Sequence, residues 1–363
     1  MEVLDSRKEK ILKAIVQEYI LTAEPIGSRT LARRYNLGVS PATIRNEMAD
    51  LEEMGLLKQP HTSAGRVPTD QGYRVYVDSL MERVSLSEGE IDEIKRRYSL
   101  SKKNEIQELI EETSELLSAQ TRHTSLVMGP NLQESSFQHI QMVPISSRRV
   151  MILLVTDTGL VQNRMVHLPG ELSRRDLGEI SSFLNERLQG LSLDDINEEM
   201  INSLERELIN RFSLLDQTLD LINTIIDITL SQGEGKIYLG GTTNILEQPE
   251  FHDLEKVKMV LRILEHEDLL YRALSGIEQG RMNIVIGEEN EFEEIHDCSL
   301  VTATYFIRGR RVGKIGVLGP KRMEYPRIIS VVDYMANILS QMLSGGEQID
   351  KNYKRQEKAR GGD

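Results

Sequence analysis

The chain of 363 residues is 39% hydrophobic and 28% charged, which is ordinary for a globular protein of two or three domains. Its longest uninterrupted apolar run, Val150–Val155, is far below the roughly 18 residues of a membrane span, so we expect no membrane partner. The net charge of −13 argues against a nucleic-acid binder, but residues 1–84 carry 12 basic and 12 acidic side chains. All of the excess acid therefore lies behind this first segment.

The cysteine count and the N-terminus indicate the compartment. The single cysteine, Cys298, excludes an internal disulfide and a cysteine-rich metal site. The start, Met1–Lys10, is charged and has no apolar segment of the kind that a secretory signal contains. We therefore expect a cytoplasmic protein.

Two helices are predicted first. Apolar side chains at Ile11, Ile15 and Tyr19 follow the spacing of one helix face, and Glu24-Pro25 ends that helix. A short second helix follows, for which Ser28 is the expected N-cap.

A third helix begins at Ser40-Pro41, because serine is favoured at the N-cap and proline at the first helical position. Ile44, Met48 and Leu51 fall on one face of it and are expected to face the core. A β-hairpin follows within Gly55–Thr69. Helix, helix–turn–helix and hairpin, in this order, predict a winged helix.

The remaining residues predict an α+β body. After a polar connector, in which Ser87 and Glu90 are spaced as a capping box, strands are expected within Thr124–Leu168. Residues 171–230 are almost entirely helical in pattern, and strands return near the end of the chain. A helical block between two strand-rich blocks predicts an inserted subdomain.

Side chains suited to DNA gather in the first domain. With the apolar face inward, Arg45 and Asn46 project near the N-terminus of the third helix, where a recognition helix meets base edges. Arginine bonds guanine and asparagine bonds adenine in the major groove, while other basic and hydroxyl side chains suit phosphates. The wing segment Gly55–Thr69 contains no acidic residue. The predicted DNA-binding residues are Arg29, Arg33, Arg34, Ser40, Thr43, Arg45, Asn46, Lys58, His61, Thr62, Ser63 and Arg66.

Other interpretations of these motifs are weaker. A winged helix can also bind proteins, and Arg45 and Asn46 alone could form a solvated helix face. His266-Glu267 lacks the second histidine of a zinc-protease helix, and 233–236 lacks the spacing of a phosphate-binding loop. Cys298 has no activating motif beside it, so we interpret it as a core residue. We expect no enzyme activity, no cofactor and no metal.

Three motifs of the first domain are distinctive: Glu24-Pro25-Ile26-Gly27-Ser28-Arg29, Ser40-Pro41-Ala42-Thr43-Ile44-Arg45-Asn46-Glu47-Met48 and the wing sequence His61–Thr69. Together they closely resemble the HrcA family of bacterial heat-inducible transcription repressors. The resemblance continues in the body at Tyr238–Asn244 and at Gly313–Pro320.

The resemblance implies a winged helix, a GAF-like domain and a mainly helical dimerising domain inserted into the GAF-like domain. It also implies that a homodimer binds double-stranded DNA at an inverted-repeat operator of chaperone operons, and that the GroE chaperonin keeps the repressor active. The expected divisions are 1–84 for the winged helix, 85–103 for a linker, 104–169 and 251–344 for the GAF-like domain, 170–250 for the insert and 345–363 for a disordered tail.

Two further hypotheses stay open. The body could sense a metabolite, as GAF-type regulators do, or the winged helix could serve protein contacts of an enzyme or chaperone cofactor. For the repressor, we expect heat to act by occupying the chaperonin with unfolded clients, after which the unassisted protein loses its dimer. The thin aromatic content, 5% with no tryptophan, motivates this expectation.

Overall fold

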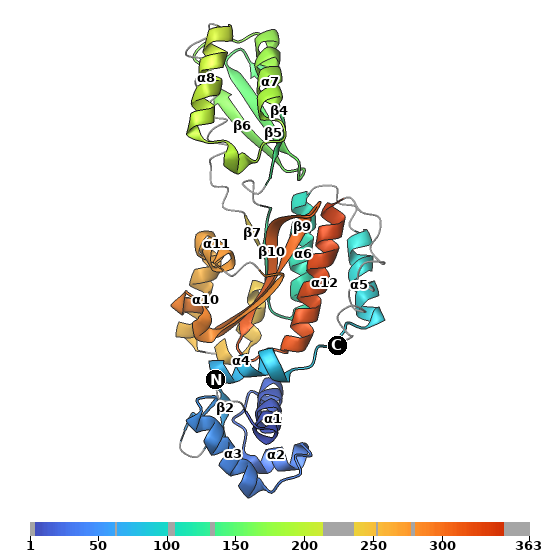
Figure 1. Cartoon of the computed structure of the whole chain (residues 1–363), viewed down its shortest axis with the longest axis vertical. Coiled ribbons are helices and arrows are strands. Elements are labelled where there is room, and N and C mark those ends of the chain that lie inside the picture. Colours follow the sequence, from blue (N-terminus) through green and yellow to red (C-terminus); the bar gives the residue numbers. More distant parts are fainter. Residues whose placement is uncertain are drawn as a thin grey trace.

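The computed structural model describes residues 4–61, 64–100, 106–130, 135–212, 236–251, 253–276 and 280–344. The molecule is elongated, with the winged helix at one end, a sheet-and-helix body in the middle and a distal unit at the other end (Figure 1). The expected tail 345–363 lies outside the described residues, as does 213–235 of the expected insert.

The predicted winged helix is confirmed in its order of elements. Asp5 caps the first helix by accepting hydrogen bonds from the backbone N–H groups of Arg7 and Lys8, both at 2.9 Å. The second helix differs from expectation, because the carbonyl of Gly27, and not the Ser28 side chain, begins it. The elements are α1 (Ser6–Thr22), α2 (Ser28–Arg34), α3 (Pro41–Glu53), β1 (Leu57–Lys58), β2 (Val67–Pro68) and α4 (Asp70–Val75), which continues as a π-helix over Tyr76–Leu80.

The segment expected to be a linker is mostly helix. Helix α5 (Glu88–Leu100) begins with the predicted capping box, in which the Glu90 N–H donates to Ser87 Oγ and the Ser87 N–H donates to Glu90 Oε2. The Tyr98 hydroxyl donates to Thr113 Oγ1 of α6 (Ile106–Thr121) across 2.7 Å in a buried contact. Helix α5 therefore packs on the body and does not hang between domains.

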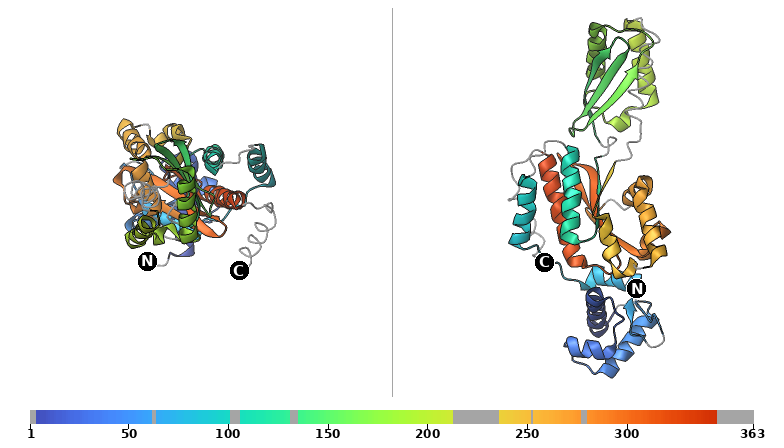
Figure 2. Two further views of the ribbon diagram at one scale, coloured as in Figure 1. Left: turned by 90° about the horizontal axis from the view of Figure 1, so that it is seen from above. Right: turned by 180° about the vertical axis from the view of Figure 1, so that it is seen from behind.

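The body is a five-stranded antiparallel sheet covered on both faces. Helices α6 and α12 (Tyr325–Leu343) lie on one face, and α10 (Leu254–Glu265) and α11 (Glu267–Ser275) lie on the other (Figures 1 and 2). Because both faces are covered, β9 and β10 are buried along nearly their whole length. In spatial order the strands are β7 (Ile237–Gly240), β3 (Thr124–Met128), β10 (Arg310–Pro320), β9 (Cys298–Ile307) and β8 (Met282–Ile286). Short 3-10 turns lie at Thr242–Glu247, Pro249–Phe251, Gly287–Glu289 and Glu293–Ile295.

The distal unit corrects the expected border of the insert. Residues 137–167, expected in the GAF-like domain, form a separate three-stranded sheet, so the insert begins near residue 135 and not near 170. Of the residues expected to form the insert, the described ones at 170–212 contain two helices and a 3-10 turn, while the three strands lie before them. These strands are recognisable from the sequence, but the alternation of apolar and polar residues does not indicate which helices the strands pack against. The elements are β4 (Phe137–Ser146), β5 (Arg149–Thr156), β6 (Val161–His167), α7 (Arg174–Leu188), a 3-10 turn at Leu193–Asp195 and α8 (Glu198–Phe212).

One hydrophobic core runs from the winged helix into the body. It includes Ile11 and Leu31 at one end and Val331 and Leu339 of α12 at the other, all of them fully buried. The tyrosine rings of Tyr73 in α4 and Tyr325 in α12 lie 6.1 Å apart at the junction. The distal unit has its own core, separate from this one.

Candidate nucleic-acid interface

The outer edge of the winged helix is formed by α2, α3 and the wing (Figure 1). In α3 the Thr43 N–H donates to Ser40 Oγ across 3.2 Å, so the predicted N-cap is confirmed. Ile44 and Leu51 are completely buried, and Met48 on the same inner face is 5% exposed. This orientation leaves Arg45 and Asn46 exposed on the outer face, at the end of the helix that the sequence predicted.

The predicted basic residues of α2 fall into two groups. Arg29 and Arg33 are exposed, and Arg33 Nε donates to the Arg29 carbonyl across 3.3 Å. Arg34 instead pairs with Glu18 of α1, whose side chain is only 3% exposed. Because a buried carboxylate needs a charged partner, Arg34 serves the packing of α2 on α1. Arg29 and Arg33 are the better placed for phosphates.

The wing carries the remaining predicted residues. Lys58 and His61 are exposed, and Thr62 and Ser63 lie outside the described residues. Arg66 is only 20% exposed and pairs with Glu52 of α3, with 2.7 Å between Nη2 and Oε2. The sequence suggests a DNA contact for Arg66, whereas the structure gives it an acidic partner inside the domain.

The base of the wing is joined to the turn before α2. Ile26 and Arg66 exchange two backbone hydrogen bonds of 2.9 Å. Gly65 is required here, because a Cβ at this position would lie 2.3 Å from the Ile26 carbonyl oxygen. The base of the wing is therefore fixed to the turn before α2.

Acidic side chains of α3 are neutralised within the domain. Lys8 Nζ lies 2.9 Å from Glu47 Oε2 and 3.0 Å from Asp50 Oδ2, and Arg7 lies 3.3 Å from Glu47. The hydrogen bond to Glu47, followed by that to Asp50, raises the pKa of Lys8. Glu47 and Asp50 are thus neutralised within the domain, whereas Arg45 stays exposed on the outer face without an acidic partner among the described residues.

Unpaired cations are concentrated at the outer edge. Among the described residues, no acidic side chain pairs with Arg29, Arg33, Arg45 or Lys58. These positive charges come from α2, α3 and β1, that is, from the helix–turn–helix and from the wing. Such a surface attracts a polyanion and can follow a phosphate backbone on both sides of an inserted helix.

Two buried acidic residues of the winged helix were not predicted to be buried from the sequence. Glu18 and Glu47 are 2% and 8% exposed and anchor α1 to α2 and α3 through ion pairs. A signal for Glu18 was present, since it lies three residues after Ile15 and seven after Ile11 on the buried helix face. An acidic residue in such a stripe indicates a partner from another element.

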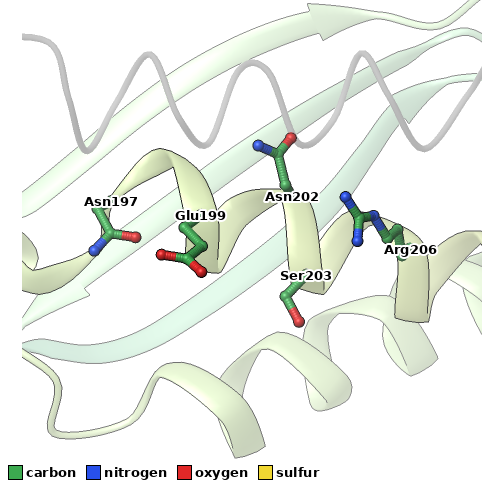
Figure 3. Close-up of a pocket in the computed structure, with 5 residues that line it drawn as sticks. All are labelled: Asn197, Glu199, Asn202, Ser203 and Arg206. Carbon is green, nitrogen blue, oxygen red and sulfur yellow. The ribbon is translucent and has the colours of Figure 1, made fainter.

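Two other features of the described residues do not point to catalysis. A hollow of about 760 Å³ is lined by polar side chains on and just before α8, which present no acid–base or nucleophilic set (Figure 3). Cys298 is completely buried, as expected for a core residue, and burial raises the pKa of its thiol. Within the described ranges, no group of His, Cys, Asp and Glu could hold a metal, and no helix is long and apolar enough to cross a bilayer.

Comparison with known proteins gives matches over almost the whole chain. A family model described as the HrcA protein C terminal domain matches residues 107–329. A second, described as a winged helix-turn-helix transcription repressor, HrcA DNA-binding, matches residues 3–80.

Similar proteins and a similar solved structure agree with these matches. The heat-inducible transcription repressor HrcA of Pelotomaculum thermopropionicum is 48% identical over 342 residues, which cover 94% of this chain and 97% of the relative. That of Moorella thermoacetica is 46% identical and covers 94% of this chain and 98% of the relative. A crystal structure described only as a hypothetical protein shares the fold with a TM-score of 0.57 at 23% identity, covering 94% of this chain and 99% of that chain.

Proposed function

Because the chain belongs to the HrcA family of heat-inducible transcription repressors and carries that family's DNA-binding winged helix, we propose that it represses chaperone operons as a homodimer on an inverted-repeat operator. The observation that carries this proposal is the outer edge of the winged helix. Arg29, Arg33, Arg45 and Lys58 have no acidic partner among the described residues, while Glu47, Asp50 and Glu52 of α3 are paired within the domain.

Specific contacts follow from the exposed side chains. Arg45 and Asn46 read bases in the major groove, because they project from the first turns of α3. Arg29, Arg33 and Lys58 bind phosphates, and His61 with the wing tip enters the neighbouring groove. Ser40 and Thr43 contribute from the helix start, whereas Arg34 and Arg66 act through their ion pairs.

The distal unit is proposed as the dimerising domain. Val150, Ile152 and Leu154 of β5 face α7 and α8, so the alternate residues of β5 face away from them. On that open face Val161 and Met165 of β6 are 56% and 48% exposed, opposite Val155 and Met151. A sheet with an apolar open face buries it best against a second copy.

The body is proposed as the GAF-like domain, and the GroE chaperonin as the partner that keeps the repressor folded. The body's antiparallel sheet, with helices on both faces, is compatible with the GAF fold. Heat loads the chaperonin with unfolded clients and thereby withdraws its support from the repressor. If the purified protein kept full DNA affinity through heating without chaperonin, this regulatory proposal would be wrong.

Fluorescence anisotropy tests the whole proposal. A labelled inverted-repeat duplex from a chaperonin-operon promoter is compared with a scrambled duplex, with and without chaperonin. Tight, salt-dependent binding to the palindrome alone, improved by chaperonin, is the expected result. Equal weak binding to both duplexes would contradict operator recognition.

One observation favours a second candidate, a metabolite-sensing regulator. A cavity of about 380 Å³ lies between the end of α1, the end of α6 and the start of α12, and its lining includes Arg122, His123, Arg322 and Arg327. Arg322 pairs with Glu250 and Arg327 pairs with Glu90, whereas Arg122 has no ion pair among the described residues, so its guanidinium is the group suited to bind a small anion there. A shift in melting temperature with a specific carboxylate or phosphate metabolite, absent in Arg122→Ala, would support this candidate.

A further inference from the structure

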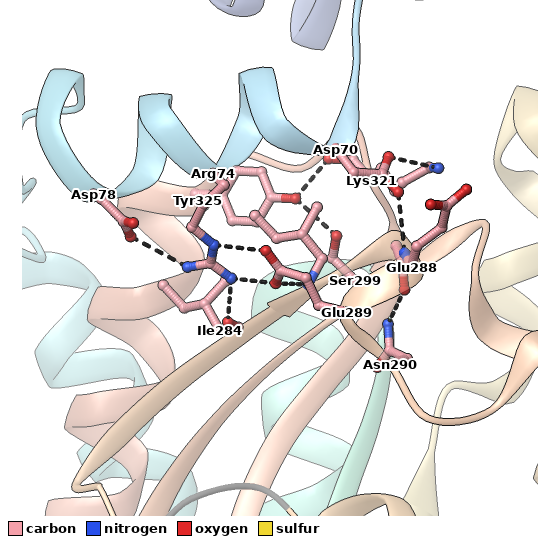
Figure 4. Close-up of polar contacts among 12 residues, drawn as sticks. Asp70, Arg74, Asp78, Ile284, Glu288, Glu289, Asn290, Ser299, Lys321 and Tyr325 are labelled. Carbon is pink, nitrogen blue, oxygen red and sulfur yellow. Dashed lines mark hydrogen bonds and ion pairs between the residues drawn. The ribbon is translucent and has the colours of Figure 1, made fainter. Parts of the chain in front are cut away.

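The winged helix and the body meet at a joint built around α4. We define the joint as the polar contacts of Asp70 and Arg74 (Figure 4) and of the end of α1 with two loops of the body, 287–289 and 321–322. All of these contacts connect residues more than 200 positions apart in the chain. They form only when the two domains adopt one relative position.

Arg74 makes the first anchor. Its Nε donates to Glu289 Oε1 across 2.8 Å, and its Nη2 bonds Glu289 Oε2 and also the Ile284 carbonyl across 2.6 Å. The two side chains are 29% and 37% exposed. A guanidinium that holds a carboxylate with two nitrogens and a backbone carbonyl at once fixes direction as well as distance.

Asp70 makes the second anchor, at the start of α4. Its Oδ1 lies 2.7 Å from Lys321 Nζ, and its Oδ2 accepts a hydrogen bond of 3.0 Å from the backbone N–H of Glu288. Gly287 permits this approach, because its φ is +55° and a Cβ there would lie 1.9 Å from Asp70 Oδ2. The body loop is thus shaped to receive this carboxylate.

Arg322 makes the third anchor. Its Nη1 donates to the Ile20 carbonyl across 2.7 Å near the C-terminal end of α1, while its Nε donates to Glu250 Oε1 across 2.6 Å. Between the anchors, Tyr73 and Tyr325 are 2% and 0% exposed. The apolar contact holds the two domains together, and the directional polar contacts set the angle between them.

The joint lies on the far side of the winged helix from the outer edge. Helix α4 lies between the body and the other helices of the domain, whereas α2 and α3 point away from the body (Figure 1). Arg74 and Asp70 therefore do not belong to the proposed DNA contacts. Their effect on DNA binding has to pass through the position of the winged helix on the body.

We propose that Arg74 and Asp70 are positioning residues that determine which half-site spacing the repressor accepts. This inference rests on the proposed dimer on an inverted repeat. In a dimer joined at the distal units, the position of each recognition helix depends on its angle to the body. A rigid joint then demands one spacing and one rotational phase of the half-sites, while a loosened joint accepts several.

The test uses the full-length protein and palindromic duplexes whose half-sites are moved apart by one to five inserted base pairs. Insertion of five pairs rotates one half-site by roughly half a turn of the duplex. We expect wild-type affinity to fall at least about tenfold between the best and the worst spacing. In Asp70→Asn/Arg74→Ala the affinity for the best operator falls, the dependence on spacing flattens to about twofold, and binding to a single half-site is unchanged.

Three variants keep the test decisive. Arg74→Lys keeps the charge but loses the two-nitrogen grip, so an intermediate dependence on spacing is expected. Glu289→Gln tests the anchor from the body and leaves the winged helix intact if the double variant fails to fold. Glu255→Gln, which breaks the exposed pair with Lys258 on α10, is the matched control and should behave as wild type.

The outcomes separate the two proposals. Wild-type protein that does not prefer the palindrome over a scrambled duplex would contradict the proposed function and this inference with it. Wild-type protein with a clear preference for one spacing, together with an equally clear preference in Asp70→Asn/Arg74→Ala and Glu289→Gln, would overturn the inference alone.

Discussion

Replacement of Glu52 by glutamine decides what Arg66 does. The guanidinium of Arg66 lies 2.7 Å from the Glu52 carboxylate, with side chains 20% and 34% exposed, and its Nε is buried without a hydrogen-bond partner. If Arg66 is a positioning residue, Glu52→Gln weakens DNA binding because the wing loses its support. If Arg66 binds a phosphate, the same change frees its charge and tightens binding.

The expected loss of stability in Glu52→Gln follows from the burial of the Arg66–Glu52 ion pair. A hydrogen bond to a charged group contributes about 1.5–3 kcal/mol, and exposed ion pairs contribute about 0–1 kcal/mol, so a half-buried pair falls near 1 kcal/mol. We expect Glu52→Gln to lower the free energy of unfolding by about 1 kcal/mol. If the same loss occurs at each of two half-sites, operator affinity falls by about 2 kcal/mol, or roughly 30-fold.

The salt dependence of operator binding separates the two roles independently. A lost phosphate contact reduces the slope of log affinity against log salt by about 0.9 per half-site. We expect Arg66→Ala and Glu52→Gln to weaken binding with the slope unchanged. Glu53→Gln, at an exposed neighbouring position, is the matched control and should have no effect. Tighter binding by Glu52→Gln, or a reduced slope in Arg66→Ala, would refute the positioning role.

Further expectations concern the recognition helix, a buried histidine and the wing. Arg45→Ala should lower the free energy of operator binding by about 1–3 kcal/mol per half-site and relax the preference for particular bases. Arg33→Ala should weaken binding to all DNA sequences alike and reduce the slope of log affinity against log salt. Equal effects of Arg45→Ala on matched and mismatched operators would exclude base recognition by Arg45. Burial, helped by the positive charge of Arg322, lowers the pKa of His123 to about 4, below its usual 6.5. Between pH 6.5 and pH 4 the unfolded chain binds a proton at His123 that the folded chain does not, so the free energy of unfolding should fall by about 2 kcal/mol over this range. In His123→Gln the fall should be smaller, and urea titrations at several pH values measure both. Gly65→Ala should destabilise the protein by about 2 kcal/mol, because its Cβ would disrupt the Ile26–Arg66 bridge. Gly27→Ala is the control and should be neutral, because its Cβ would meet nothing within 4 Å. Similar urea midpoints for the two variants would contradict this role of Gly65.

The DNA-binding fold could be predicted because its signals are local. The Ser40-Pro41 start, the inward Ile44 and the order of helices and hairpin each follow from residues close together in the chain. The same locality predicted the Ser87–Glu90 capping box. Exposure of Arg45 and Asn46 then followed from helical spacing alone.

What failed depends on contacts between distant segments. The strand pattern at 149–156 is the same whether α7 or α12 covers it, so the insert was given a border some 35 residues too late. Arg66 looked like a free cation because nothing in the local sequence places Glu52 beside it. Single-sequence patterns identify which side chains are charged, and the tertiary structure decides which charges remain unpaired.

The division of the apolar interior has a consequence for heating. One core joins the winged helix to one face of the body sheet, and a second core lies between the other face of that sheet and α10 and α11. The distal unit has its own core and, in the described residues, contacts the body through Arg308 and Arg310 at the turn of Asp157. The winged helix and the body should therefore unfold as one cooperative unit, and the distal unit should unfold as another. If the distal unit unfolds first, heat separates the two copies of the dimer while each winged helix stays folded. Repression can then return on cooling without refolding of the domain that binds DNA.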